Sequence, residues 1–199
     1  MKAAPAATVR GVIEGHGTAV VPSLRFTRAE YYALSKLLRP EDRYELLDGI
    51  IYALTAPGPP HASTVAYFVY HLSRRDSYLV KSENALEIDS PGAEGTPQPD
   101  VAVVPMRADF YATRQPTGAD AQLVIEVGDS ERNPRAKMSM YMRDGRIPLA
   151  WRIDIPNRCV EIWTPADPEN PRDILRGDDE FEFDGISFTV SAIPAFKAR

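Results

Sequence analysis

Apolar and polar positions alternate along the chain in short runs, which predicts a domain that mixes helices and strands. Thr27-Arg28-Ala29-Glu30 has the pattern of a capping box, in which the Thr27 side chain caps a helix and Glu30 reaches back to it. This helix is expected to run to about Leu38, because Pro40 ends it. A second helix is expected over residues 61–74, where apolar residues recur on one face.

The strands are indicated by turn residues and by continuous apolar runs. Asp48-Gly49 lies between two apolar runs of residues 44–54 and is the strongest short hairpin signal in the chain. Pro156-Asn157 marks a second hairpin in the same way. Two apolar runs, at residues 99–104 and 122–127, are typical of buried strands. Shorter strands are expected at residues 78–81, 85–88, 174–175, 180–183 and 187–190, with a turn-rich loop over residues 91–97.

A third helix is expected to begin at Asn133-Pro134, with Asn133 as its cap, and to end near Gly145. The resulting order of helices and strands predicts an α/β fold with a mixed central β-sheet flanked by helices. No interior linker divides the chain, so residues 26–199 are expected to form one domain behind an N-terminal tail or peripheral segment of residues 1–25.

Composition is that of an ordinary globular protein, with 44% hydrophobic and 26% charged residues among 199. No apolar stretch is long enough for a membrane span, and no signal-peptide core follows the N-terminus. The single cysteine, Cys159, excludes an internal disulfide. We therefore expect a cytoplasmic protein. The net charge of −5 argues mildly against tight non-specific binding of nucleic acid, although a site built of carboxylates is acidic until a metal ion enters it.

Two carboxylates interrupt the buried strands. Asp100 begins one strand and Glu126 ends the next, so an antiparallel pairing would bring both to one edge of an apolar sheet. A buried charge is costly unless it is paired or binds a metal ion. Carboxylate oxygens suit Mg²⁺ or Mn²⁺.

Lys137 lies in the first turn of the helix that follows Glu126. The N-terminus of that helix is expected near the carboxyl end of the strand, where its free N–H groups favour an anion. Acidic metal ligands, a lysine and such a helix end together describe a site for phosphodiester hydrolysis. The alternative is that the two acidic residues merely cap strands and that the lysine is solvated.

His61 and Tyr141 are further candidates. His61 follows a proline-rich turn and could contact substrate or move a proton, or it could pack against its helix. Tyr141 lies one turn after Lys137 and could orient the lysine or a phosphate, or it could fill the core.

Taken together, these residues resemble the Uma2 family of predicted endonucleases, a branch of the PD-(D/E)XK nuclease superfamily. The matching pieces extend from about Phe26 to Val190. They are Tyr44-Glu45-Leu46-Leu47-Asp48-Gly49-Ile50, Pro57-Gly58-Pro59-Pro60-His61, Pro99-Asp100-Val101-Ala102-Val103-Val104, Val124-Ile125-Glu126-Val127, Lys137 with Tyr141, and Trp151-Arg152-Ile153-Asp154.

The resemblance implies a restriction endonuclease-like core and assigns a role to each site residue. Asp100 and Glu126 would be metal ligands, Lys137 the catalytic lysine and Glu45 an additional acidic residue that completes the metal shell. The parent superfamily places its lysine two residues after the acidic residue, where this chain has Gly128, so the Uma2 pattern with a lysine on the next helix fits better.

The expected function is that of a Mg²⁺- or Mn²⁺-dependent endonuclease that acts on nucleic acid, in the first place DNA. The segment from Gly128 to Pro134 is shorter than the family's usual Ser/Thr-rich stretch, and Asn133 lies near the position of its Asp. The alternative is therefore a catalytically degenerate module that keeps the fold and binds nucleic acid or a protein partner. No membrane partner is expected, and pairing of sheet edges into a homodimer stays open.

Overall fold

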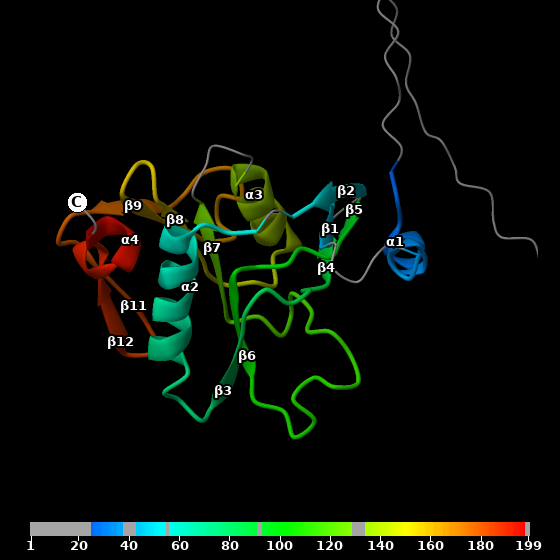
Figure 1. Ribbon diagram of the computed structural model, residues 1–199, viewed down its shortest axis with the longest axis horizontal. Coiled ribbons are helices and arrows are strands. Elements are labelled where there is room, and N and C mark those ends of the chain that lie inside the picture. The colour runs from blue at the N-terminus through cyan, green and yellow to red at the C-terminus, as the bar shows by residue number, and fades with distance from the viewer. Residues whose placement is uncertain (1–24, 38–42, 55, 91–92, 129–133, 198–199) are drawn as a thin grey trace, which may run out of the picture.

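A six-stranded mixed sheet is the centre of the structure, a computed structural model that describes residues 25–37, 43–54, 56–90, 93–128 and 134–197 (Figure 1). Neighbouring strands are antiparallel except for the parallel pair β7 and β8. In spatial order the strands are β10 (Asp173–Arg176), β9 (Cys159–Trp163), β8 (Ala150–Asp154), β7 (Leu123–Gly128), β6 (Val101–Pro105) and β3 (Tyr78–Lys81).

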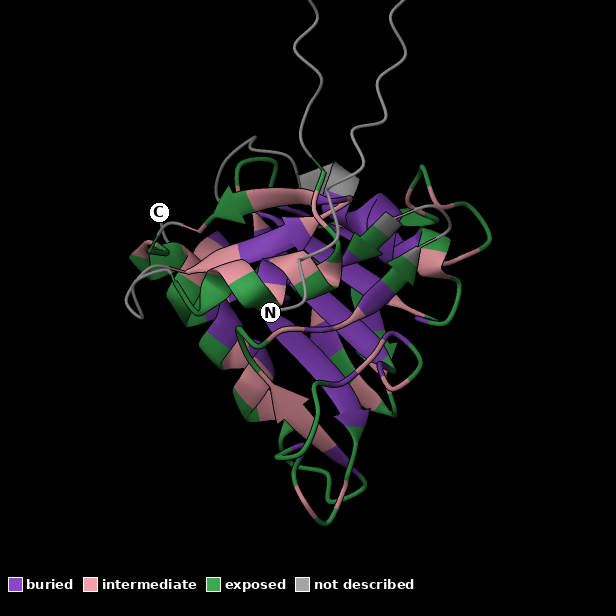
Figure 2. Cartoon of the chain, turned by 90° about the vertical axis from the view of Figure 1, so that its right-hand side faces the viewer, coloured by how far each residue is buried: buried purple, intermediate pink, exposed green. Residues whose placement is uncertain are grey.

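The two longest helices cover opposite faces of this sheet. Strand side chains alternate between the faces, so each strand contributes to two cores. Ile125 and Val127 pack with Phe68 of α2 (Pro59–Leu72), whereas Val124 packs with Met138 of α3 (Pro134–Asp144). Figure 2 shows the central strands as mostly buried and the loops at the lower end of the molecule as mostly exposed. The predicted α/β architecture is confirmed.

A smaller layer lies beside α3 and contains the first hairpin. Helix α1 (Arg28–Ser35) begins with the predicted capping box at Thr27. Strands β1 (Tyr44–Leu47) and β2 (Ile50–Ala53) pair around Asp48-Gly49, as predicted; both turn residues have positive φ, which suits the twist of a tight hairpin. A bridge between Leu46 and Thr96 joins this hairpin to the next segment.

That next segment differs from the prediction. The strand expected at residues 85–88 is β4 (Ile88–Ser90), and the expected loop at residues 91–97 contains β5 (Ala93–Gly95), which pairs with it. These three-residue strands have no apolar alternation of their own. Leu86 and Ile88 are buried against α3, so tertiary packing places this segment.

The C-terminal part covers α2. Hairpin β11 (Glu180–Phe183) and β12 (Ile186–Thr189) brings Phe181 and Phe188 onto Trp151 of the sheet. The short helices η1 (Val190–Ala192) and α4 (Pro194–Lys197) follow. Both tryptophans of the chain, Trp151 and Trp163, are buried. In the described part of the chain, no helix is long and apolar enough to cross a membrane. Residues 1–24 of the expected N-terminal segment and the cap residue Asn133 lie outside the described residues.

Candidate active site

Asp100 and Glu126 lie side by side, as the antiparallel pairing predicted. Val101 is opposite Ile125 in the register of β6 and β7, so Asp100 directly precedes the paired segment beside Glu126. The backbone N–H of Val127 donates to Asp100 Oδ2 at 2.6 Å. One edge of an otherwise apolar pair of strands therefore has two carboxylates.

Lys137 joins this edge to the first hairpin. Its ammonium group lies 3.0 Å from Glu126 Oε1 and 3.0 Å from Glu45 Oε2, and it donates to the backbone carbonyl of Gln98 at 3.0 Å. The lysine is only 9% exposed, and Glu45 and Glu126 are buried as well. All four residues indicated by the sequence, Glu45, Asp100, Glu126 and Lys137, are thus brought together.

The protonation of this cluster follows from its burial. Burial, the largest influence, raises the pKa of Glu126 to about 8; the Lys137 ammonium opposes the rise, whereas Asp100 and Glu45 add to it. Burial alone would lower the pKa of Lys137, but the carboxylates of Glu126 and Glu45 outweigh it and raise that pKa above its usual value. Lys137 is therefore cationic at neutral pH, and Glu126 binds a proton more tightly than an ordinary glutamate does.

Tyr141 and His61 each contact one of the two strand carboxylates. The buried Tyr141 hydroxyl donates to Glu126 Oε1 at 2.6 Å, one helical turn beyond Lys137. Burial, followed by the charge of Glu126, raises the pKa of Tyr141 well above its ordinary value, so the phenol keeps its proton. His61, in the first turn of α2, places Nε2 3.2 Å from Asp100 Oδ1. Both side chains orient a carboxylate, a role in addition to those considered from the sequence.

Gln98 is a site residue that the sequence reasoning missed. Its backbone N–H donates to Glu45 Oε2 at 3.0 Å, and its carbonyl accepts from Lys137. Its side chain donates to the Tyr44 carbonyl, which fixes the segment to β1. The signal was available: Gln98 stands between Pro97 and Pro99, so it has the only backbone donor of the three.

A second buried ionic group, also missed, lies on the same face of the sheet. Arg152 of β8 is opposite both Glu126 of β7 and Glu161 of β9 in register. Its guanidinium Nη1 lies 2.8 Å from Asp154 Oδ2 and 2.9 Å from Glu161 Oε1. The signal was that charged residues alternate with apolar ones in two strands that are buried throughout.

The donor set suits a hard divalent cation in its chemistry. Asp100, Glu126 and Glu45 offer carboxylate oxygens, the ligands that Mg²⁺ and Mn²⁺ prefer. Among the residues that the structure describes, no three Asp, Glu, His or Cys side chains form a ready metal-binding group. Instead, the Lys137 ammonium is paired with two of the carboxylates, and it neutralises charge that a metal ion would otherwise balance.

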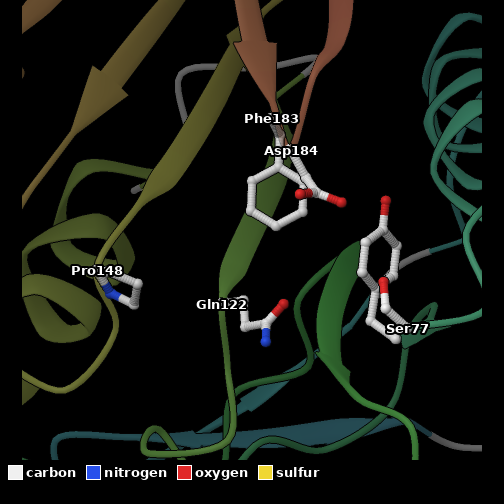
Figure 3. Close-up of a pocket in the computed structure, with 6 residues that line it drawn as sticks. Ser77, Gln122, Pro148, Phe183 and Asp184 are labelled. Atoms are coloured by element: carbon white, nitrogen blue, oxygen red, sulfur yellow. The ribbon is translucent and has the colours of Figure 1, made fainter.

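The pocket in Figure 3 is distinct from this cluster. It has a volume of about 440 Å³ and lies at the opposite end of the sheet, where Gln122 precedes β7, Pro148 precedes β8 and Phe183 and Asp184 come from the β11–β12 hairpin. Gln122 is four residues before Glu126, roughly 13 Å along a strand. The pocket therefore has no part in the chemistry of the carboxylates.

The mixed sheet and its helices define a restriction endonuclease-like α/β fold. A solved structure with this fold, described as a putative nuclease belonging to DUF820 from Anabaena variabilis, aligns with a TM-score of 0.67 at 15% identity, over 86% of this chain and 98% of the other. The Uma2 profile, described as "Putative restriction endonuclease", matches residues 28–191. The chain belongs to the Uma2 family. No curated protein matches it.

Family membership supports a nuclease function, and with it a nucleic acid as substrate. Restriction endonuclease-like nucleases generally use divalent metal ions. The structural likeness, at this low identity, concerns the fold alone.

Proposed function

We propose that the protein is a metal-dependent endonuclease that hydrolyses phosphodiester bonds, with DNA as its substrate. The observation that supports this most directly is the convergence of Glu45, Asp100 and Glu126 around the buried Lys137. A fold without a task for these groups would gain more from apolar side chains, because buried ion pairs often contribute little net stability.

Asp100 and Glu126 would hold a divalent cation, with Glu45 as the additional acidic ligand. When bound, such a cation polarises the phosphate and lowers the pKa of a water molecule. Glu126 must give up its proton to act as a ligand, since a carboxylate binds metal only in its ionised form. The hydrogen bond from Val127 and the contact with His61 orient Asp100.

Lys137 would position the attacking water or stabilise the negative charge that develops on the phosphate. Its ammonium is held by Glu45 and by the carbonyl of Gln98, so its place does not depend on Glu126 alone. A charge fixed in a dry site needs little reorganisation during the reaction and is worth more there than in water. Tyr141 fixes the orientation of Glu126.

Cleavage of plasmid DNA in Mg²⁺ or Mn²⁺ tests this proposal. The variants Asp100→Asn, Glu126→Gln and Lys137→Met should each lower the rate about 100-fold or more, because the first two remove a carboxyl that would bind the metal and the third removes the ammonium, while the approximate shape is kept. Glu182→Gln, at an exposed position of β11, is the matched control and should cleave like the wild type. Equal residual cleavage by all of these proteins would refute the proposal.

A catalytically degenerate module is the second candidate. It is favoured by the pairing of Lys137 with two carboxylates and by the lack of a ready three-ligand group among the described residues. Such a module would bind nucleic acid, or a protein partner, without any turnover that depends on metal. Salt-sensitive DNA binding by a protein whose cleavage is unchanged by EDTA would favour it.

A further inference from the structure

Residues 106–118, which we call the Phe110 loop, connect β6 toward β7 and display apolar side chains to solvent. The loop is drawn in green below β6 in Figure 1. Phe110 is 60% exposed and Met106 is 42% exposed. Two large apolar side chains are thus exposed within one loop, and exposed apolar surface of this kind can serve for contact with a partner.

The loop is held in one conformation. Asp109 accepts hydrogen bonds from the guanidinium of Arg107, from the backbone N–H of Tyr111 and from the hydroxyl of Thr113. Asp120 binds Arg114 through both carboxylate oxygens and accepts from the backbone and hydroxyl of Thr117. The loop is therefore organised before any partner arrives, which lowers the entropic cost of binding.

Phe110 and Tyr111 both adopt left-handed backbone conformations, with φ of 50° and 61°. Bulky side chains rarely accept this region, and such strain persists only where the surroundings enforce it. Here the hydrogen bonds to Asp109 enforce it. The consequence is that the Tyr111 ring is buried while the neighbouring Phe110 ring faces solvent.

Three cations surround the buried ring. The guanidinium groups of Arg107 and Arg114 each lie 5.1 Å from the Tyr111 centroid, and the ammonium of Lys81 lies 5.7 Å from it. Among the described residues, two carboxylates pair with these cations: Asp109 with Arg107 and Asp120 with Arg114. Both arginine side chains are more than a third exposed. Each guanidinium has five N–H donors, so donors remain beyond those that the carboxylates take.

Of these three cations, Lys81 lies on the same face of the sheet as Glu126. Lys81 of β3, Ala102 of β6 and Val124 of β7 form one row across the three strands. Val124 packs against α3. Because side chains alternate between the two faces along a strand, Glu126, two residues later in β7, lies on the same face. Lys81 is therefore two strands away from β7, at the level of a residue that precedes Glu126 by two positions. It lies on the face of the sheet where Lys137 contacts Glu126.

We infer that the Phe110 loop is a nucleic-acid contact surface, in which Lys81, Arg107 and Arg114 bind backbone phosphates and Phe110 stacks on an unstacked base. The inference rests on the proposed function, because it takes its partner from it. Phe110 is an exposed aromatic ring in the same loop as the partly exposed Arg107 and Arg114, and aromatic rings combined with cations are how proteins hold bases without reading their sequence. A purely apolar partner would leave the excess positive charge of the three cations over the two carboxylates without a counter-charge, whereas backbone phosphates would supply one.

Binding to a fluorescent 20-nucleotide DNA, measured by anisotropy in EDTA, tests this surface without any cleavage. Phe110→Ala should weaken binding about 5-fold or more, since stacking on an aromatic side chain contributes that much per base. Tyr70→Ala is the matched control: Tyr70 is 61% exposed but lies on α2. Arg114→Gln should weaken binding and reduce its salt dependence, whereas Arg74→Gln, next to Tyr70, should do neither. The single-stranded DNA and its duplex, each with one 2-aminopurine, are the two arms of the experiment. Stacking on Phe110 should quench the 2-aminopurine fluorescence, so the form of DNA whose quenching is lost in Phe110→Ala is the form that presents the unstacked base.

The outcomes separate this inference from the proposed function. Equal affinity of the wild type, Phe110→Ala and Arg114→Gln overturns the inference, while the loss of metal-dependent cleavage in Glu126→Gln would still uphold the nuclease. A change in oligomeric state of Phe110→Ala on gel filtration, with unchanged DNA affinity, overturns it in favour of a contact between copies. A wild type that binds neither arm overturns it as well.

Discussion

Glu126 lies in an environment that disfavours the charged form of its carboxyl. Its carboxyl lies in the interior between Tyr141 and Lys137, with Asp100 and Glu45 close enough to raise its pKa. A carboxylate without partners would be costly there, which is why one ammonium and one hydroxyl are directed at it. Because the unfolded chain lacks this environment, the pKa of Glu126 is raised only in the folded state.

Removal of this carboxyl should change how stability depends on pH. The folded pKa of Glu126, about 8, lies above its ordinary value of 4.5, so the bound proton stabilises the fold below pH 4.5 and that contribution is lost as pH rises through 8. The wild type in EDTA should lose a few kcal/mol over this window. Glu126→Gln, which cannot ionise, should show a flatter profile in urea unfolding between pH 4.5 and 8. Parallel profiles would contradict the assignment.

Tyr141 allows a test of positioning with a matched hydroxyl elsewhere. Tyr141→Phe removes the donor to Glu126 and keeps the packed ring, so the cleavage rate should fall about 10-fold and stability by about 1 kcal/mol. The Tyr78 hydroxyl is also buried but has no hydrogen-bond partner among the described residues. Tyr78→Phe should therefore leave both cleavage and the urea midpoint near the wild-type values. If Tyr141→Phe lost no more cleavage and stability than Tyr78→Phe, the bond to Glu126 would be unimportant.

At the scale of elements, local patterns predicted those segments whose conformation is determined locally. The capping box at Thr27 and the turn at Asp48-Gly49 lie where expected, because side-chain caps and positive φ act within a few residues. β4 and β5 were displaced or missed, since short strands exist only through the partners that they pair with. Hairpin β1–β2 matters most for the site, because it places Glu45.

Gly49→Ala should destabilise the protein by more than the backbone strain of a positive φ alone would. Gly49 has φ +78°, and an added Cβ would lie 3.0 Å from the Cβ of Arg25 and 3.3 Å from the carbonyl of Phe26. Gly177 also has positive φ, at +57°, but an added Cβ there meets nothing within 4 Å. Gly177→Ala should cost about 1 kcal/mol from strain, and Gly49→Ala clearly more, in the free energy of unfolding by urea. Equal losses would show that the contact with residues 25 and 26 does not matter.

At the scale of the whole molecule, the site joins segments that are distant in sequence. The adjacency of Asp100, Glu126 and Lys137 was predictable, because one antiparallel pair and the helix after it suffice to bring them together. Glu45 was indicated only by the family resemblance, since nothing local predicts where its hairpin docks. Gln98 and Arg152 were missed because their partners depend on the packing of a proline segment against β1 and on the order of strands in the sheet.

The buried charges of the described residues are unbalanced, with more acids than bases. The buried acidic residues are Glu45, Glu126, Asp154 and Glu161, and the buried basic residues are Lys137 and Arg152. Arg152 and Lys137 each contact two buried carboxylates, so both groups have an excess of acid, and partly buried Asp100 adds a further carboxyl to the cluster around Lys137. A divalent cation would correct the excess of acid around Lys137, where burial first of all, and then the charges of Asp100 and Glu45, raise the pKa of Glu126.

Mn²⁺ should therefore stabilise the whole protein in proportion to its occupancy of the site. A ligand that binds only the folded state contributes about 2.7 kcal/mol at one hundred times its Kd, which for a chain of this size raises Tm on the order of 5 °C or more. The rise should be larger at pH 8 than at pH 6, because the metal displaces the proton of Glu126. Asp100→Asn and Glu126→Gln should abolish it, whereas Glu182→Gln on the surface should keep it. A shift of the same size in all four proteins would place the metal elsewhere, and no shift in the wild type would remove the basis for metal-dependent cleavage.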